Sequence, residues 1–294
     1  MMRSSLSAAT QLRLALSAAC VGIAALCAGP VSAQSSDATR ILSIGGSVTE
    51  IVYALNQQHR LIARDTTSVF PEAAIKLPDV GYIRALSAEG VLSVAPELIL
   101  SEEGAGPPET VAALQAASIP FVTIPEAYTA QGVVAKVLAV GEALGQQQAA
   151  QALGDQINQQ FAQAADKLNG VTERKKVLFV LSTQGGRVLA SGTHTAADGI
   201  ITMAGGINAI TAFEGYKPLT DEAILAAAPD VILMMDRTGD HAIDDEAIRA
   251  MPAFMPTAAA QTGAIIRMDG AYLLGFGPRT AQAALDLHAA LYGG

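Results

Sequence analysis

Beyond its first 33 residues the chain has no cysteine, and therefore no side chain for disulfide or thiol chemistry. Its 294 residues include two cysteines, Cys20 and Cys27, and no tryptophan, and aromatic residues make up 4% of the total. Both cysteines lie before residue 34, so the rest of the chain offers no disulfide, thiolate metal site or cysteine nucleophile. Basic residues are also scarce, with 18 Lys and Arg against 27 Asp and Glu. This acidic balance argues against nucleic acid or an anionic membrane as a partner.

The first 33 residues have the pattern of a cleaved secretory signal. Arg3 and Arg13 accompany an apolar, small-residue run over 14–26, and residues 31–33 (VSA) form a small-x-small cleavage site. The run is too short and too rich in alanine for a membrane span, although an N-terminal anchor is the alternative. Cleavage removes two basic and no acidic residues, so the mature charge is 16 − 27 = −11. The exported chain of about 260 residues is long enough for one sizeable core or two smaller ones.

A fifteen-residue segment occurs twice in the chain. Residues 86–100 (LSAEGVLSVAPELIL) align with residues 219–233 (LTDEAILAAAPDVIL) at an offset of 133, with seven identical pairs. Each copy follows a Gly-Tyr pair, Gly81-Tyr82 in the first case and Gly215-Tyr216 in the second. Solenoid repeats are much shorter, so this match predicts two lobes built on one plan. Two such lobes imply a cleft between them, and we expect the functional site there.

Outside the repeat, short apolar strands alternate with helices, which is typical of an α/β fold. The expected strands are 40–44, 61–64, 97–101, 121–124, 176–182, 188–191, 231–235 and 264–268.

Residues 130–168 differ from the rest, because apolar side chains recur there every three to four positions and no proline interrupts them. A continuous helix of this length would reach about 50 Å, and Gly145 is a place where it could break. We therefore divide the chain into a signal (1–33), an N-terminal α/β lobe (34–129), a connecting helix (130–168) and a C-terminal α/β lobe (169–294).

Tyr82 and Arg84 are the most informative pair of side chains. In open α/β sheets ligands bind beyond the carboxyl ends of the strands, and the loop that holds this pair is expected to reach that rim. A nearby guanidinium favours the phenolate form of a tyrosine, and tyrosine is a known axial ligand of haem iron. The alternative is a surface tyrosine stacked on an arginine.

Glu89 and Glu222 occupy the same position in the two copies of the repeat. Each is expected in the first turn of a helix, behind Ser87 or Thr220 as the N-cap, where a carboxylate complements the helix dipole. One interpretation is that both are simply good helix starts. The functional interpretation is a pair of acidic groups, one per lobe, that dock a two-fold symmetric partner through arginines.

The four histidines do not form a metal site. No two of His59, His194, His241 and His288 have metal-ligand spacing, so a zinc site is not expected. His194 is a candidate second axial ligand on a rim loop, with an ordinary solvated histidine as the alternative. No Ser-His-Asp order, nucleophile elbow, phosphate loop or paired-carboxylate motif can be assembled. The sequence therefore predicts a protein that is not an enzyme.

The sequence resembles the periplasmic haem-binding proteins of bacterial haem ABC importers, within a larger group that binds siderophores and cobalamin. The Gly-Tyr-x-Arg that precedes Leu-Ser-Ala-Glu-Gly resembles the haem-specific form, and Thr-Glu-Ile is shared with the wider group. The likeness covers essentially the whole mature chain and is found in SIGGSVTEIVYAL (43–55), DVGYIRALSAEGVLSVAPELIL (79–100), GTHTAADGIITMAGGINA (192–209), GYKPLTDEAILAAAPDVIL (215–233) and DGAYLLGFGPR (269–279).

The resemblance implies a class III periplasmic binding protein, in which two Rossmann-like α/β lobes are joined by one long interdomain helix and close little on binding. It implies ferric haem in the cleft, with Tyr82 as the axial ligand and Arg84 hydrogen-bonded to the same oxygen. It also implies that Glu89 and Glu222 contact the membrane permease.

Three further residues are our own candidates for contacts to the haem propionates or the rim. Arg237, Lys217 and Tyr272 are chosen because each is expected beside the end of a strand. The propionates need cationic or hydrogen-bonding partners, of which the mature chain has few.

The expected function is that of a periplasmic protein that binds haem and delivers it to an inner-membrane ABC permease–ATPase complex, downstream of an outer-membrane haem receptor. A ferric-siderophore or cobalamin binding protein of the same fold is the first alternative. A periplasmic haem storage protein or haem-dependent enzyme is the second.

Overall fold

The structure is a computed structural model, and it describes residues 37–168, 170–236 and 243–293. The expected signal segment 1–33 and the candidate Arg237 lie outside the described residues. The chain separates into two units, Met1–Val31 and Ser32–Gly294, and the description below concerns the second. Within the described part, no helix combines the length and the apolar character needed to cross a membrane.

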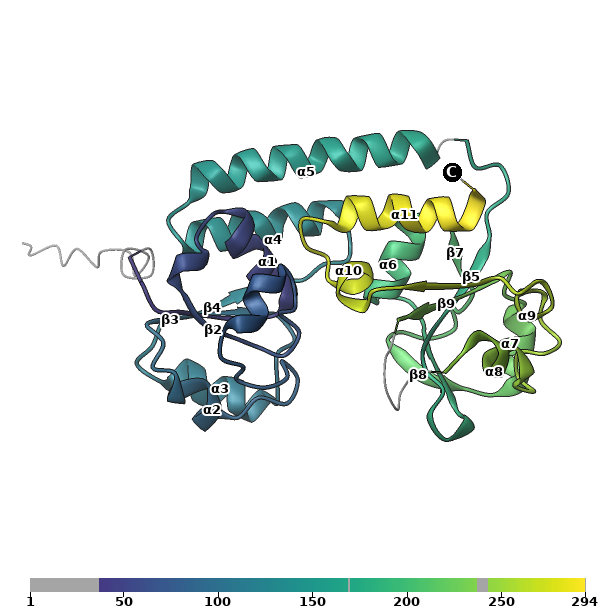
Figure 1. The fold of residues 1–294 in the computed structure, drawn as a ribbon, viewed down its shortest axis with the longest axis horizontal. Coiled ribbons are helices and arrows are strands. Elements are labelled where there is room, and N and C mark those ends of the chain that lie inside the picture. Colours follow the sequence, from purple (N-terminus) through teal and green to yellow (C-terminus); the bar gives the residue numbers. More distant parts are fainter. Residues whose placement is uncertain (1–36, 169, 237–242, 294) are drawn as a thin grey trace, which may run out of the picture. The chain divides into compact units, whose positions relative to one another are not determined.

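The first half of this unit folds around a four-stranded parallel sheet (Figure 1). Its order is β2-β1-β3-β4, and each predicted strand is confirmed to within one residue at either end. Parallel neighbours require crossover connections, which helices provide here. The strands are β1 (Ile41–Ile44), β2 (Leu61–Arg64), β3 (Leu98–Glu102) and β4 (Phe121–Ile124), and the connections contain α1 (Gly46–Ala54), η2 (Gln58–Arg60), η3 (Glu72–Lys76), α2 (Ala88–Ser93) and α3 (Pro108–Ala116).

The second half contains a mixed sheet with the path β10-β9-β5-β6-β8, and β7 pairs with β5 off this path. The three strands β10, β9 and β5 are parallel, whereas β6 runs antiparallel to both of its neighbours. The expected strands are again confirmed to within one residue, but β7 and β8 were not predicted. The strands are β5 (Lys176–Ser182), β6 (Val188–Ser191), β7 (Ile207–Asn208), β8 (Tyr216–Leu219), β9 (Val231–Met235) and β10 (Ile265–Met268).

Helices cover both faces of this second sheet, so the α/β fold class is confirmed. The helical segments of this half are η4 (Gln184–Gly186), α6 (Ala196–Met203), α7 (Asp221–Ala227), α8 (Asp245–Ala250), α9 (Ala258–Thr262), α10 (Gly270–Leu274) and α11 (Thr280–Tyr292).

Residues 130–168 form two helices instead of one 50 Å helix, and the break lies at Gly145, the position where the sequence allowed for one. Helix α4 (Ala130–Ala143) ends before Gly145, which has a positive φ of 69°, and α5 (Gln147–Leu168) begins after it. The two helices pack so closely that a Cβ on Gly141 would lie 2.1 Å from the Cβ of Ala150. Helix α5, about 33 Å long at 1.5 Å per residue, packs against α4 and also against α11 (Figure 1). It thus connects the two halves, while the exact lobe boundaries stay a prediction.

Strand alternation distributes the apolar side chains over three cores. Along β3 and β9, Leu98 and Val231 point into a large core shared by α1, α4, α5, α6 and α11. The next residues, Ile99 and Ile232, point into separate cores on the opposite sheet faces. Helices α2 and α3 cover one of these opposite faces, and α7, α8 and α9 cover the other. Helices α2 and α7 therefore both lie away from the shared core (Figure 1).

The sequence repeat is also a structural repeat. The offset of 133 maps β3 onto β9 and aligns the helices α2 and α7. Each helix is capped by the predicted side chain, since Ser87 accepts from the backbone N–H of Gly90 and Thr220 accepts from that of Ala223. Even an unusual backbone conformation repeats, because Ala95 and Ala228 both adopt left-handed φ values, 47° and 46°.

Candidate functional site

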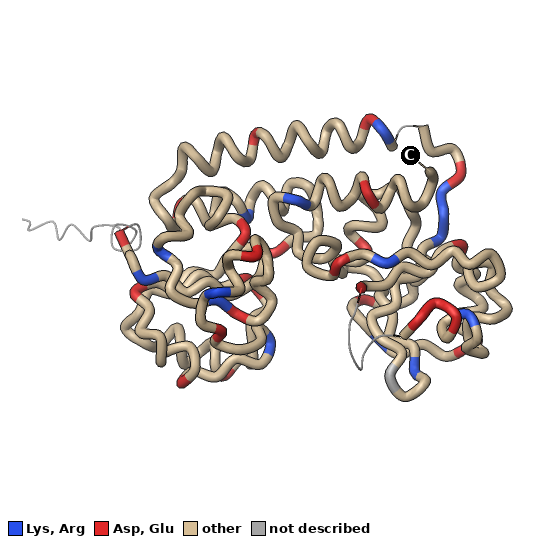
Figure 2. Tube along the Cα trace, viewed as in Figure 1, with Lys and Arg blue, Asp and Glu red and all other residues tan. Residues whose placement is uncertain are grey.

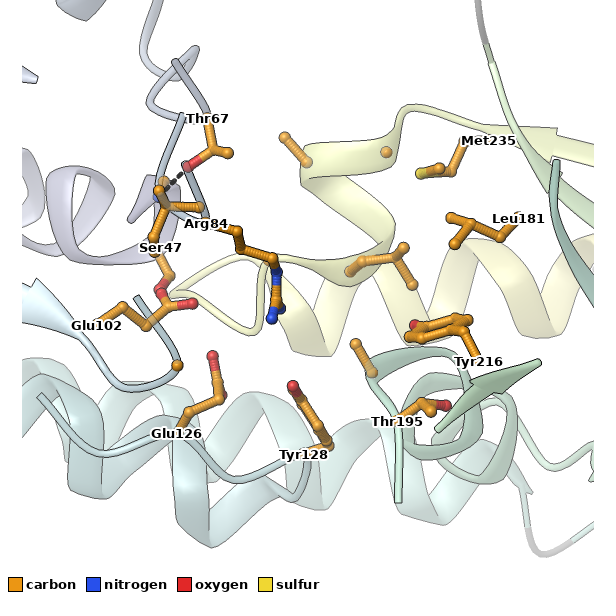
Figure 3. A pocket seen from close by; sticks show the side chains of 18 of the residues that line it. Ser47, Thr67, Arg84, Glu102, Glu126, Tyr128, Leu181, Thr195, Tyr216 and Met235 are labelled. Atoms are coloured by element: carbon orange, nitrogen blue, oxygen red, sulfur yellow. Dashed lines mark hydrogen bonds between the residues drawn. The ribbon is translucent and has the colours of Figure 1, made fainter. Parts of the chain in front are cut away.

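Residues from both halves line a cleft of about 960 Å³, within the usual size range of ligand pockets. The sequence predicted that the residues after the strands would form it, and the structure confirms this for most of the strands. The contributions are Gly46 and Ser47 after β1, Thr67 after β2, Glu102 to Gly104 at the end of β3, Glu126 and Tyr128 after β4, Ser182 at the end of β5, Met235 at the end of β9 and Gly270 after β10 (Figure 3).

The loop between β2 and α2 presents Tyr82 and Arg84 at this cleft, as the sequence predicted. The intervening Ile83 is buried in the N-terminal core, so its two neighbours are directed outward. The backbone of Gly81 holds the loop, because its carbonyl accepts from Thr66 N–H at 3.0 Å and its N–H donates to Asp79 at 2.8 Å. Tyr82 is 47% exposed, so its ring is available to a ligand.

The guanidinium of Arg84 extends into the cleft toward Tyr128 and Glu126 (Figure 3). Among the described residues it has no hydrogen bond and no ion pair. Its positive charge opposes the effect of burial on the pKa of both Tyr128 and Tyr216, although burial dominates and raises each pKa. Arg84 is therefore an available cation near three tyrosines of the cleft.

A buried lysine lies behind the cleft lining on its N-terminal side and contacts three of the residues that form it. Lys136 of α4 is fully buried, and its ammonium donates to Glu126 Oε2 at 2.6 Å and to Ser47 Oγ at 2.9 Å. Glu102 Oε2 is 3.5 Å from the same ammonium and accepts a hydrogen bond from the Ser47 hydroxyl. One ammonium thus lies close to two carboxylates, and within the described ranges Glu126 Oε1 is buried with no hydrogen-bond partner.

This arrangement changes the proton affinity of Glu126. Its pKa is raised to about 7, mainly by burial and also by the negative charge of Glu102, while the positive charge of Lys136 opposes the rise. The carboxyl of Glu126 therefore keeps its proton to a higher pH than an exposed glutamate does.

An ion pair joins the two halves beside the cleft. The Nε and Nη2 atoms of Arg279 donate to Glu50 Oε2 at 3.0 and 2.9 Å. The same guanidinium lies 3.6 Å from the centre of the Phe70 ring and 5.1 Å from that of Tyr272. Sequence reasoning missed Arg279 as a site residue, and the available signal was its place at the end of the segment DGAYLLGFGPR.

The C-terminal half contributes Tyr216 and His194 to the cleft. The phenol oxygen of Tyr216 accepts hydrogen bonds from Thr195 and from the backbone of Ala197 at the start of α6, and these oppose the rise of its pKa by burial. His194 lies just before α6, as predicted, with its side chain 76% exposed and its Nδ1 3.4 Å from Glu214 Oε1. Such exposure is that of a solvated histidine, and its role as a ligand stays a prediction.

Lys217 is not among the residues that line the cleft. It lies next to Tyr216 on β8, and successive side chains of a strand point to opposite faces. Tyr216 packs edge-on against Phe179 of the shared core, whereas the Lys217 ammonium lies 5.2 Å from the ring centre of Phe213 on the other side. The placement of Lys217 at the cleft is therefore corrected.

Tyr272 is also outside the cleft lining. It belongs to α10, and its hydroxyl donates to Asp286 of α11 at 2.8 Å. Burial raises the pKa of Tyr272, and this hydrogen bond raises it further. The phenol thus packs between α10 and α11 of its own half. The expected placement of Tyr272 at the rim of the cleft is therefore corrected.

Glu89 and Glu222 are both exposed, and each is the second residue of its helix. Hydrogen bonds from its own backbone N–H and from Thr220 lower the pKa of Glu222. Among the described residues, neither carboxylate has a cationic partner. Because α2 and α7 lie on the faces away from the shared core, both carboxylates are on one side of the unit.

The chain matches a family model described as periplasmic binding protein over residues 41–272. Among solved structures it is similar to the periplasmic haem-binding protein BhuT in complex with two haems, with 39% identity, a TM-score of 0.81 and coverage of 86% of this chain and 97% of that one. It is similar to the apo form of the periplasmic haem-binding protein RhuT from Roseiflexus sp. RS-1, with 37% identity, a TM-score of 0.82 and the same coverages. An uncharacterized ABC transporter substrate-binding lipoprotein, YvrC of Bacillus subtilis, is 23% identical over 86% of this chain and 80% of its own length.

Proposed function

The chain belongs to the periplasmic binding protein family, and from this membership we propose that it binds ferric haem in its cleft and delivers it to an inner-membrane ABC importer. Two similar solved structures, each covered over 97% of its length, are named as haem-binding proteins. The observation in this chain that supports haem most directly is the placement of Tyr82 and Arg84 together at the cleft.

In this proposal Tyr82 provides the axial ligand of the haem iron. A phenolate oxygen is a hard anionic donor, and tyrosine is an established haem ligand. Arg84 lines the same cleft two residues further along the loop, and in this proposal its guanidinium donates a hydrogen bond to the ligating oxygen. The open position of Tyr82 supports this role, since a tyrosine that is 47% exposed can contact a ligand without unfolding of the loop.

The chemistry of the cleft lining fits an amphipathic porphyrin. Aromatic and aliphatic side chains suit the ring faces, and the lining includes Val69, Phe70, Tyr128, Leu181, Tyr216, Met235 and Leu274. Arg84 and Arg279 provide one cation from each half for carboxylate groups of the ligand. The carboxylates of Glu102 and Glu126 on the floor would repel propionates, so we expect the propionates to face away from Lys136.

Delivery would use Glu89 and Glu222 as contacts to the permease. Their support is geometric, since both are exposed at the same position of repeated helices. We propose a binding role rather than a catalytic one, and a periplasmic location after cleavage of residues 1–33. Supply through an outer-membrane haem receptor completes the proposed route.

Titration of the purified mature protein with three cargoes tests the proposal. We expect hemin to bind saturably with a high-spin ferric absorption spectrum, and to bind more tightly than cyanocobalamin or the ferric siderophore ferrichrome. If either competitor bound more tightly than hemin, that competitor and not haem would be assigned as the cargo. Turnover of peroxide well above that of free hemin would instead favour an enzyme.

A further inference from the structure

One side of the cleft is closed by the segment between β4 and α4. Tyr128 of this segment packs against the C-terminal half, since a Cβ on Gly199 of α6 would lie 2.5 Å from its carbonyl oxygen. Glu102 and Glu126 line the cleft beside it with side chains that are 18% and 10% exposed, whereas the side chain of His194, elsewhere in the lining, is 76% exposed. We call the part of the lining formed by Glu102, Glu126 and Tyr128 the closed side.

The hydrogen-bond donors behind the closed side are already in use. The ammonium of Lys136 has three N–H groups, and its three neighbours are Glu126 Oε2 at 2.6 Å, Ser47 Oγ at 2.9 Å and Glu102 Oε2 at 3.5 Å. The hydroxyl of Ser47 in turn donates to Glu102. In the part of the chain that the structure describes, the buried Oε1 of Glu126 has no hydrogen-bond partner. The two carboxylates therefore offer acceptors to a ligand, and the lysine behind them has no donor left for one.

Cations that could compensate a ligand carboxylate at the closed side are scarce. Lys and Arg occur singly along the chain except at 174–176 (Figure 2), and among the described lining residues they are Arg84 and Arg279. In the proposed haem complex Arg84 is bound to the ligating oxygen of Tyr82, and Arg279 is held in its ion pair. Tyr128 stays neutral, because burial raises its pKa. A carboxylate pressed against the closed side would therefore lose its hydration without gaining a cation, which is costly.

Haem carries both of its carboxylates on one edge of the ring, and the opposite edge is apolar. It can therefore enter with the apolar edge toward the closed side, whereas a porphyrin with carboxylates on both edges, such as coproporphyrin III, has no such orientation. We propose that Glu102 and Glu126 make the cleft selective for iron porphyrins with carboxylates on one edge only, by rejecting a carboxylate at the closed side. The inference rests on the proposed haem binding and deepens it, because it names the class of porphyrin that the cleft accepts.

Absorption titration of the purified mature protein with hemin, iron(III) mesoporphyrin IX and iron(III) coproporphyrin III tests this selectivity. The last two ligands differ only in bearing ethyl groups or propionates at the same ring positions, so the ratio of their dissociation constants isolates the added carboxylates. The titration is done at pH 8, where Glu126 is mostly ionised because its pKa is about 7.

The variants are Glu126→Gln and Glu102→Gln, with circular dichroism to check that each is folded. The matched control is Glu103→Gln, which removes a third carboxylate of the cleft lining. Glu103 is exposed and accepts a hydrogen bond from the backbone N–H of Glu126 at 3.1 Å, which the amide oxygen of a glutamine can also accept.

We expect the wild type to bind iron coproporphyrin at least about tenfold more weakly than iron mesoporphyrin. Each of the two closed-side variants should reduce this ratio at least about threefold, and the control should keep it. Equal binding of the two ligands by the wild type would overturn the proposal, and so would an unchanged ratio in both variants or an equal reduction in the control. Failure of the wild type to bind hemin is a separate result, which would refute the proposed function and this inference with it.

Discussion

Arg279 and Glu50 are 229 residues apart in the chain and form an ion pair between its two halves. Both Nε and Nη2 of the arginine donate to the same carboxylate oxygen, and the second oxygen, Glu50 Oε1, is buried with no hydrogen-bond partner in the part of the chain that the structure describes. The pair therefore depends on the arginine to offset the cost of a buried negative charge.

Replacement of Arg279 by Ala should lower the free energy of unfolding by about 1–3 kcal/mol, less than for a fully buried pair because the arginine side chain is 30% exposed. Urea denaturation at pH 7 measures it. The control is Arg267→Ala, which breaks an ion pair with the half-exposed Asp245 and should cost about 0–1 kcal/mol. Equal costs for the two variants would contradict the role assigned to Arg279.

The raised pKa of Glu126 should make stability depend on pH in a defined direction. In the unfolded chain this carboxyl ionises near its ordinary value of 4.5, whereas in the folded protein it ionises near about 7. The folded state thus holds the proton more tightly, and stability from this group is lost as pH rises from about 4.5 to about 7. Above that range the loss is complete.

Glu126→Gln removes this titration and keeps a similar shape. We expect the unfolding free energy of the wild type, measured relative to that of the variant, to fall by about 1–3 kcal/mol between pH 5 and pH 8. Urea denaturation across this range gives the difference and cancels the contributions of the other carboxylates. A constant or rising difference would show that Glu126 is ionised throughout.

Gly141 should be sensitive to a single added methyl group. A Cβ there would lie 2.1 Å from the Cβ of Ala150, so Gly141→Ala forces α4 and α5 apart. Overpacking of this kind costs about 1–3 kcal/mol, which outweighs the gain of up to about 1 kcal/mol in helix propensity. In Gly154→Ala the nearest atom is Val134 Cγ1 at 3.2 Å, which can move, so its change in melting temperature should be much smaller. A larger loss for Gly154→Ala would argue against this helix contact.

Substitution of Glu89 and Glu222 should lower the delivery of haem to the permease without changing the affinity of the protein for haem. Haem uptake by a strain that carries Glu89→Ala with Glu222→Ala should fall at least about tenfold, because both contacts to the permease would lose their charge. Glu109→Ala with Glu246→Ala is the control, since these exposed glutamates are also second residues of helices, α3 and α8. Hemin titration of both variants should match the wild type. If the two double variants took up haem at similar rates, the proposed docking role of Glu89 and Glu222 would be contradicted.

The sequence predicted the elements of this fold better than their final contacts. Strand periodicity and the internal repeat were sufficient for the α/β class and for the positions of β3, β9, α2 and α7. The separation of α4 from α5 depends on how the two helices pack against each other. The spacing of apolar residues alone does not distinguish two helices that fold back on each other from one continuous helix.

The candidate site was predicted in part for a related reason. Tyr82 and Arg84 could be found because two informative side chains share one short loop. The Lys136 cluster could not, because its members come from α1, β3, α4 and the loop before α4, and only the tertiary fold brings them together. The prediction placed Lys217 at the cleft because β8 was not recognised as a strand. Side chains alternate between the two faces of a strand, and this alternation directs Tyr216, not Lys217, to the cleft.

Hemin titration of Tyr82→Phe, followed by absorption spectroscopy, is the most direct test of the proposed site. The substitution removes one oxygen atom and keeps the ring, and Tyr216→Phe is the matched control from the opposite side of the cleft. We predict that Tyr82→Phe loses the high-spin ferric spectrum and at least about tenfold in hemin affinity, while Tyr216→Phe keeps the wild-type spectrum. A Tyr82→Phe variant with wild-type spectrum and affinity would contradict the account.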